Sequence, residues 1–320
     1  MTNVQQKLFE VGIIPVVVID DVKDALPLAK ALYEGGIKAA EVTFRTEAAA
    51  DAIKAMSDAY PDMLVGAGTV LTPAQADKAK ANGAKFIVSP GLNPIVVRHC
   101  QEIGVEIVPG VSSASEIEQA MSLGLDTVKF FPAEAAGGIP MLKSLCAPYK
   151  NIKFMPTGGL NEKNFIDYLA LDCVFCAGGG FVANTKLVKE GNFDKIREIA
   201  QETVKTMHGF KIVHVGINAG SGANAYDIAK MFAPFCLEIN RDTDAGMFLN
   251  NDIEIMKKPW YGEKGHIAIA CNNIKRAEAY LKSIGVKFIE ESKNIDAKGN
   301  YKAVYIDGDI AGFAVHLVQK

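Results

Sequence analysis

Short apolar runs alternate with amphipathic stretches through the first two thirds of the chain. Eight runs have the length and the β-branched or aromatic content of strands, and the stretches between them are rich in Ala, Leu, Glu and Lys, as helices are. Two of these helices have clear start signals, because "TPAQ" places Thr72 before Pro73 and "SASE" places an N-cap at Ser113 to Ser115. The predicted strands cover residues 13–20, 38–44, 64–68, 85–89, 105–110, 127–131, 152–156 and 173–179.

Eight strand and helix units in about 200 residues predict an α/β fold, namely a (β/α)8 TIM barrel near the compact end of its size range. An open doubly wound sheet is the alternative, which the glycine-rich ends of several strands leave open.

The pattern changes after a long helical segment, 193–207. The last 113 residues carry four of the five histidines and read β-α-β-β-β twice, with helices near 223–232 and 274–284. We therefore expect a barrel domain over residues 1–207 and a smaller α+β domain of paired βαβββ units over residues 208–320. The strands of the second domain are predicted at 211–217, 235–240, 246–250 and 253–258, and again at 265–270, 287–292, 302–308 and 313–318.

Composition and charge limit the function classes. The 320 residues are 49% hydrophobic and 22% charged with a net charge of −3, which indicates a globular protein and no nucleic-acid partner. The longest apolar runs, such as "IIPVVVI", are too short to span a bilayer, and the N-terminus lacks a signal-peptide core. We expect a cytoplasmic enzyme that does not bind membranes.

Six cysteines are scattered along the chain, most of them in apolar surroundings. They indicate reduced core thiols rather than a disulfide framework. Cys173 and Cys176 have the spacing of a redox or zinc pair, but a strand would point them to opposite faces.

One lysine lies inside an apolar strand. In "TVKFF" the two-residue period puts Thr127, Lys129 and Phe131 on one face and Val128 and Phe130 on the other. Lys129 would then point into the barrel near the C-terminal strand ends, where such folds carry out their chemistry. Desolvation lowers the pKa of an amine and makes it nucleophilic, so the position indicates a Schiff base. The alternative is a lysine whose ammonium reaches solvent.

A carboxylate occupies a comparable position in "AAEVTFRTE", where Glu41, Thr43 and Arg45 share a face. Inside a barrel, Glu41 can pair with Lys129 or relay protons; a purely structural ion pair is the alternative. Arg45 lies four strand residues further on, about 13 Å at ~3.3 Å per residue, so we expect it at the barrel mouth, where it can bind a carboxylate.

Glycines follow the last two strands of the first domain. "PTGGL" and "AGGGF" stand where backbone N–H groups commonly hold phosphate in this fold. Two such loops in these two places favour a phosphate site, whereas either alone would be an ordinary turn.

Residues 1 to about 207 resemble the class I aldolase family that includes 2-keto-3-deoxy-6-phosphogluconate (KDPG) and 4-hydroxy-2-oxoglutarate (KHG) aldolases. The resemblance rests on "EVTFRTE", "VGAGTVLTP", "SPGLN", "VPGVSSASE", "VKFFPAEAAGG" and "PTGGL", in this order. It implies that Lys129 forms an imine with C2 of a 2-oxo acid, that Glu41 shuttles protons, and that Arg45 and Thr69 hold the pyruvate carboxylate. It also implies pocket positions at Pro90, Phe131 and Thr157 and a phosphate site at Gly158, Gly159, Gly179 and Gly180.

The implied activity is cleavage of KDPG to pyruvate and glyceraldehyde 3-phosphate, of KHG to pyruvate and glyoxylate, or of both. The resemblance further implies a small-molecule 2-oxo acid substrate, no cofactor for the aldolase reaction, and a homotrimer. The family has serine where this chain has Gly180, so we expect a weaker preference for phosphorylated substrate. The alternatives are a phosphate-binding barrel isomerase without a covalent intermediate and a barrel that only binds a ligand.

Residues 210–320 resemble the vicinal oxygen chelate superfamily of glyoxalases and bleomycin-resistance proteins, on architecture and on "HVGI" and "GHIAIA". The resemblance implies a divalent metal such as Zn²⁺, Ni²⁺, Mn²⁺ or Fe²⁺, for which imidazole and carboxylate ligands are suited. The matching ligands are His214, Glu254, His266 and His316, with His316 in place of the usual glutamate. The alternative is a metal-free assembly or regulatory module.

Overall fold

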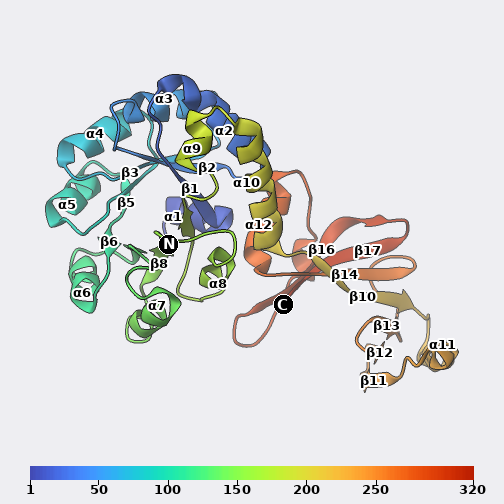
Figure 1. Cartoon of the computed structure of the whole chain (residues 1–320). Coiled ribbons are helices and arrows are strands. Elements are labelled where there is room, and N and C mark those ends of the chain that lie inside the picture. Colours follow the sequence, from blue (N-terminus) through green and yellow to red (C-terminus); the bar gives the residue numbers. More distant parts are fainter. The chain divides into compact units, whose positions relative to one another are not determined.

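The computed structural model describes all 320 residues, which form two units, Met1–Met207 and His208–Lys320 (Figure 1). The first unit contains two sheets and the second a single sheet, and each unit has its own hydrophobic core. No helix in the structure is both long enough and apolar enough to cross a membrane.

Parallel strands and intervening helices build the first unit. Two sheets have the orders β5-β4-β3-β2-β1-β9 and β6-β7-β8, and neighbouring strands in both sheets pair in parallel. The strands are β1 (Ile13–Val17), β2 (Ala39–Thr43), β3 (Leu64–Gly68), β4 (Phe86–Val88), β5 (Glu106–Val108), β6 (Gly110–Val111), β7 (Thr127–Phe130), β8 (Lys153–Pro156) and β9 (Ala177–Gly179).

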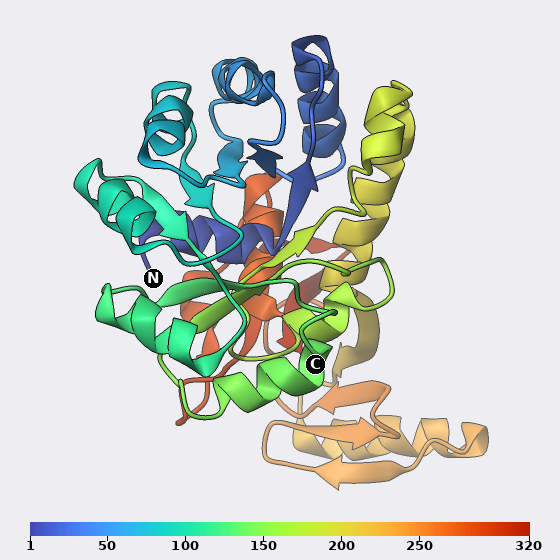
Figure 2. The ribbon, with the colours of Figure 1, turned by 60° about the vertical axis from the view of Figure 1, so that its left-hand side comes forward.

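Helices surround these strands: the N-terminal helix lies across one end of them and the others lie outside (Figure 2). They are α1 (Asn3–Val11), α2 (Ala25–Glu34), α3 (Ala49–Ala59), α4 (Pro73–Ala81), α5 (Pro94–Glu102), α6 (Ala114–Ser122), α7 (Gly138–Cys146), α8 (Phe165–Leu169), α9 (Thr185–Lys189) and α10 (Phe193–His208), with a 3-10 turn at Val22–Asp24. The predicted caps are present, because the hydroxyls of Thr72 and Ser113 accept hydrogen bonds from the first turns of α4 and α6. The predicted alternation of strands and helices is confirmed.

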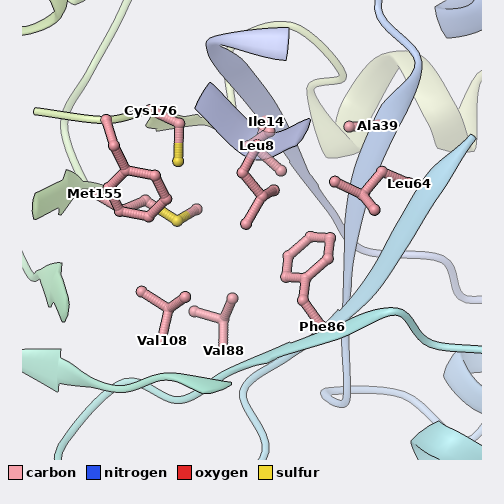
Figure 3. Close-up of a cluster of buried hydrophobic side chains, with 10 residues drawn as sticks. Leu8, Ile14, Ala39, Leu64, Phe86, Val88, Val108, Met155 and Cys176 are labelled. Carbon is pink, nitrogen blue, oxygen red and sulfur yellow. The ribbon is translucent and has the colours of Figure 1, made fainter. Parts of the chain in front are cut away.

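One end of the strands is closed by α1. Thr2 and Gln5 form a capping box that starts this helix, and the Gln5 amide donates to Glu106, Asp126 and Thr127 at the starts of β5 and β7. Leu8 of α1 is fully buried in a cluster with side chains from several strands, shown in Figure 3. The N-terminal strand ends are therefore filled, and a ligand must enter at the C-terminal ends.

The prediction of six reduced core cysteines is wrong. Cys146 at the end of α7 and Cys173 before β9 form a disulfide with a Cα–Cα distance of 6.2 Å. Cys236 is free but exposed, whereas Cys100, Cys176 and Cys271 are free and buried as expected. The two bonded cysteines are 27 residues apart, and only the packing of α7 beside the segment that follows α8 brings them together.

The second unit is a single eight-stranded sheet of order β11-β12-β13-β10-β14-β17-β16-β15. Its two halves meet where β10 and β14 pair antiparallel, and each central strand pairs parallel with the last strand of its own half. The duplicated βαβββ order is thus present. The elements are β10 (Lys211–Asn218), α11 (Gly222–Phe232), β11 (Ile239–Asp242), β12 (Gly246–Leu249), β13 (Ile253–Met256), β14 (Gly265–Cys271), α12 (Ile274–Ser283), β15 (Asn294–Ile295), β16 (Tyr301–Ile310) and β17 (Phe313–Gln319).

Two edge strands differ from their predicted positions. A 3-10 turn over Ala233–Phe235 delays β11, since Pro234 favours the turn and Cys236 has a φ of 59°. A second 3-10 turn, Glu290–Ser292, takes the second half of the segment predicted as strand 287–292, and only the two-residue β15 follows it. Both segments lie at sheet edges, where few neighbours enforce an extended backbone.

Candidate active site

Lys129 lies in β7 between Gly110 of β6 and Met155 of β8. Its side chain is 6% exposed, and Nζ lies 3.3 Å from Glu41 Oε1. Nζ also lies 5.1 Å from the centre of the Phe131 ring. The amine is therefore held inside the strands against one carboxylate and one aromatic ring rather than in solvent.

Glu41 lies in β2, and its side chain is only 1% exposed. A Cβ added to Gly68 would lie 2.2 Å from Glu41 Oε1, so the glycine at the end of β3 leaves the space that this carboxylate occupies. Oε2 of Glu41 is buried and has no hydrogen-bond partner. Since an unsatisfied buried carboxylate oxygen is costly, it marks a place where a ligand group can donate.

Arg45 and Thr69 follow the ends of β2 and β3. Arg45 is exposed, and its Nε donates to Thr69 Oγ1 at 3.4 Å. Thr69 has a φ of 57°, which is unusual for a β-branched residue and is often found at functional sites. The guanidinium thus lies at the C-terminal ends of the strands, as expected for a mouth residue.

The glycines after β8 lie next to the segment after β7. Gly158 and Gly159 have φ values of 98° and 85°, which other residues rarely adopt. A Cβ on Gly158 would lie 3.3 Å from the Phe131 ring, and one on Gly159 would lie 2.6 Å from Glu134 Cβ. The loop can approach these residues closely only because both positions lack side chains.

Thr157 is buried between these loops and pairs with Gly178 of β9 in a parallel bridge. A Cβ on Gly178 would lie 2.3 Å from Thr157 Oγ1, so this glycine makes room for the hydroxyl. The space beside Gly180 is open, because the atom nearest to a Cβ added there would be Val16 O at 3.8 Å. Gly179, by contrast, is packed against Ile13 and Phe181.

Pro90 lies beside the strand that neighbours Lys129. A Cβ on Gly110 would lie 2.1 Å from Pro90 O, so the segment after β4 packs directly against β6. Pro90 thus lies at the same strand ends as Phe131 and Thr157. The structure therefore brings the residues predicted for the first unit to one end of its sheets.

Sequence reasoning missed two supporting features. Gly68 and Gly178 leave room for Glu41 and Thr157, and the only signal for them was a glycine near a strand end. The Tyr168 hydroxyl donates to Glu134 Oε1, which ties α8 to the segment that follows β7. Burial raises the pKa of the Tyr168 hydroxyl, with Glu134 as a second cause, so it remains a donor at neutral pH.

A second cluster lies on one face of the sheet in the other unit. Side-chain nitrogens of His214, His266 and His316 all lie within 4.8 Å of one another. Glu254 Oε2 lies 3.5 Å from His214 Nε2 and 3.2 Å from His266 Nε2. The four residues predicted as metal ligands are therefore adjacent.

The electrostatics of this cluster suit a cation. Both ring nitrogens of His316 are buried without a partner, as is Nδ1 of His266. Burial, with the neighbouring His266 and His214, lowers the pKa of His316 to about 3, and burial also lowers the pKa of His214. Both imidazoles are neutral at pH 7, so their lone pairs are available to a metal.

Comparisons with known proteins cover the first unit. The family model "Aldolase: KDPG and KHG aldolase" matches residues 4–199. A 2-dehydro-3-deoxy-phosphogluconate aldolase of Treponema pallidum is 46% identical over 205 residues, which cover 64% of this chain and 98% of that protein. The KHG/KDPG aldolase of Escherichia coli is 40% identical over 204 residues, covering 64% and 96%.

The KDPG aldolase of Legionella pneumophila, whose structure holds pyruvate as a covalent carbinolamine intermediate, has a TM-score of 0.61 with this chain. The two are 42% identical, and the match covers 62% of this chain and 97% of the other.

Proposed function

Because the chain belongs to the KDPG and KHG aldolase family, we propose that its first unit cleaves a 2-oxo acid of the KDPG or KHG type through an imine on Lys129. The observation that carries this proposal is the buried pair of Lys129 and Glu41, with Nζ 3.3 Å from Oε1. A lysine amine and a carboxylate in contact supply the nucleophile and the proton carrier that a Schiff-base aldolase needs.

The reaction follows from these two groups. The Lys129 amine attacks C2 of the substrate, and loss of water gives an iminium ion. Glu41 accepts the proton of the C4 hydroxyl, the C3–C4 bond breaks, and its electron pair moves into the iminium to form an enamine. The aldehyde leaves, C3 is protonated, and hydrolysis releases pyruvate. Glu41 suits the proton transfers because its Oε2 is buried and free of protein partners.

Binding is assigned to the groups around this pair. The Arg45 guanidinium, held by Thr69, binds the substrate carboxylate at the mouth. Pro90, Phe131 and Thr157 form the wall around C2 and C3. The backbone of Gly158, Gly159, Gly179 and Gly180 holds the phosphate of KDPG or the second carboxylate of KHG.

The glycine at position 180 gives a prediction on substrate choice. Gly180→Ser adds a hydroxyl where an added Cβ has no neighbour closer than 3.8 Å and where the glycine has no positive φ, so the variant should fold normally. We expect kcat/KM for KDPG to rise by about ten-fold and kcat/KM for KHG to change little, because a hydroxyl adds one hydrogen bond to a charged phosphate. Equal changes for both substrates, or a wild-type preference above about 10⁴ for KDPG, would show that the backbone cradle alone is sufficient.

A phosphate-binding isomerase without a covalent intermediate is the second candidate for the first unit. It would use Glu41 for proton transfer and would not need the Lys129 amine to be nucleophilic. The membership of the family favours the aldolase, and trapping of an imine separates the two.

We also infer that the two parallel sheets of the first unit close into one (β/α)8 barrel. Only Pro109 separates β5 from β6, β9 pairs with β1, and the bridges Phe154↔Val174 and Thr157↔Gly178 link β8 to the β9 segment. We expect such barrels to assemble as a homotrimer in solution, which light scattering of the full chain measures.

For the second unit, we propose a vicinal oxygen chelate fold that binds one divalent metal ion through His214, Glu254, His266 and His316. Three imidazoles and one carboxylate fit Zn²⁺, Ni²⁺, Mn²⁺ or Fe²⁺. The buried nitrogens of His316 that lack partners support a ligand at this place. A bound ion would supply a Lewis acid to the face of the sheet.

Replacing His266 with alanine tests the site. The metal affinity of the variant should fall by about 100-fold or more, so that it loses most of the bound metal, since a four-ligand site rarely survives the loss of a central imidazole. The aldolase activity should stay unchanged, because it belongs to the other unit. His99→Ala is the matched control, since His99 pairs with Asp77 in the first unit. The measurement is the metal content of the untagged protein after incubation with each ion. Less than about half an ion per wild-type chain would contradict the metal site and leave only an assembly or regulatory role for the second unit.

A further inference from the structure

A cross-strand row on the sheet of the second unit joins the proposed metal site to an arginine. The register pairs Arg241 of β11 with Phe248 of β12, Phe248 with Glu254 of β13, Glu254 with Gly216 of β10, and Gly216 with His266 of β14. Residues paired across neighbouring strands project from the same face. Arg241 therefore lies on the face that carries Glu254 and His266.

The remaining two histidines lie in the next row of that face. His214 precedes Gly216 by two residues and pairs with Ala268, and Ala268 pairs with His316. Gly216 in the first row leaves space for the neighbouring imidazole, since an added Cβ would lie 2.1 Å from the His266 ring. The four proposed ligands and Arg241 thus share one face of the sheet.

The guanidinium is held in place without an acidic partner. Its Cζ lies 3.7 Å from the centre of the Phe248 ring, and that ring contacts His214 edge-on at 5.4 Å between centres. Arg241 forms none of the ion pairs of the structure, although Asp242 adjoins it. The Asp242 carboxylate instead binds Lys257 and Tyr226. Arg241 is exposed, so its charge is free to pair with an anion from solvent.

The accessible side of the cluster is the side toward Arg241. The side chains of His214 and Glu254 are each 15% exposed, whereas that of His266 is 3% exposed. His316 is covered on its other flank by Tyr305, which stacks on it at 4.6 Å between ring centres. A ligand from solvent reaches the cluster past His214 and Glu254. On this side the Phe248 ring lies between the Arg241 guanidinium and the His214 ring.

We propose that this face binds a small organic acid whose carboxylate pairs with Arg241 while another of its oxygens binds the metal ion. The inference rests on the metal site proposed above. Arginine suits the role because its planar guanidinium matches a carboxylate with two parallel hydrogen bonds and its stacking on Phe248 fixes its orientation. A neutral molecule of the same size would leave the guanidinium without a partner.

Cobalt spectroscopy of the untagged full-length chain tests the proposal. Co²⁺ is added first, and its visible absorption reports on the metal site. Sodium lactate is then titrated, because it carries a carboxylate and a neighbouring oxygen but no carbonyl that could form an imine with Lys129. We expect lactate to shift the Co²⁺ spectrum, and neutral lactamide to cause no shift.

Arg241→Met should keep the Co²⁺ stoichiometry and weaken lactate binding by at least about ten-fold, since it removes a charge-assisted pair. Lys230→Met, which removes one positive charge from α11 of the same unit, should leave lactate binding unchanged. A wild-type chain that binds no Co²⁺ would overturn the metal site and this inference with it. If Co²⁺ binds normally, the metal site is retained. The organic-acid proposal alone is then overturned by any of three results: lactate gives no shift, Arg241→Met binds lactate equally well, or inorganic phosphate binds and lactate does not.

Discussion

Replacing Lys129 with alanine is expected to abolish retro-aldol cleavage of both KDPG and KHG. The amine is the only group placed to hold the electron pair of the breaking C3–C4 bond, since it lies buried beside Glu41 and Phe131. Without the imine the carbanion has no electron sink, so turnover should fall below about one percent of wild type. Steady-state assays that follow pyruvate release measure this loss.

Stability must be followed in the same variant, because the change leaves the Glu41 carboxylate buried without its cationic partner. Breaking such a pair costs about 3–5 kcal/mol. The double variant Lys129→Ala/Glu41→Gln removes that charge and should unfold at a higher temperature than Lys129→Ala while remaining inactive. Lys153→Ala, a change of the partly exposed lysine at the start of β8, is the matched control and should keep its activity. Substantial turnover by folded Lys129→Ala would contradict the covalent mechanism.

Glu41→Gln is expected to lower kcat by about 10²- to 10⁴-fold, the usual contribution of a positioned proton carrier. Glutamine keeps the shape of the side chain, and Gly68 leaves the space for it, so substrate binding should change little. KM should therefore stay within a few-fold of wild type while kcat falls. Pyruvate should still form an imine with Lys129 in this variant, only more slowly.

Glu47→Gln provides the control for this change. Glu47 is an exposed carboxylate two residues beyond Arg45, and its loss alters the charge near the mouth without touching the pair. Its kcat should equal that of wild type. A loss of less than about ten-fold for Glu41→Gln would assign the proton transfers to another group or to water.

The strand and helix order was predictable because the buried faces of strands and helices produce a periodic pattern of apolar residues in the sequence. Lys129 and Glu41 could be singled out for the same reason: a charged residue in an apolar strand violates the pattern and needs a cause. Their contact was predicted only as one of the roles open to Glu41, since 88 residues separate them and only the fold joins β2 to β7. The free Oε2 of Glu41 and the space left by Gly68 depend on side-chain packing, so neither could be predicted from the sequence.

Other features were missed for identifiable reasons. The disulfide of Cys146 and Cys173 depends on the packing of a helix end against a loop, which cysteine spacing does not encode. The short β15 and the delayed β11 lie at sheet edges, where local turn preferences outweigh strand propensity. The row that ends at Arg241 follows from sheet register alone, so the sequence offered only an arginine in a polar segment.

Borohydride trapping measures the central claim most directly. The full-length protein is incubated with pyruvate, reduced with borohydride, digested, and mapped by mass spectrometry. The account predicts one reduced pyruvyl group per chain, attached to Lys129 and absent from Lys129→Ala. An unmodified Lys129 in protein that still cleaves its substrate, or a pyruvyl group on a different lysine, would contradict it.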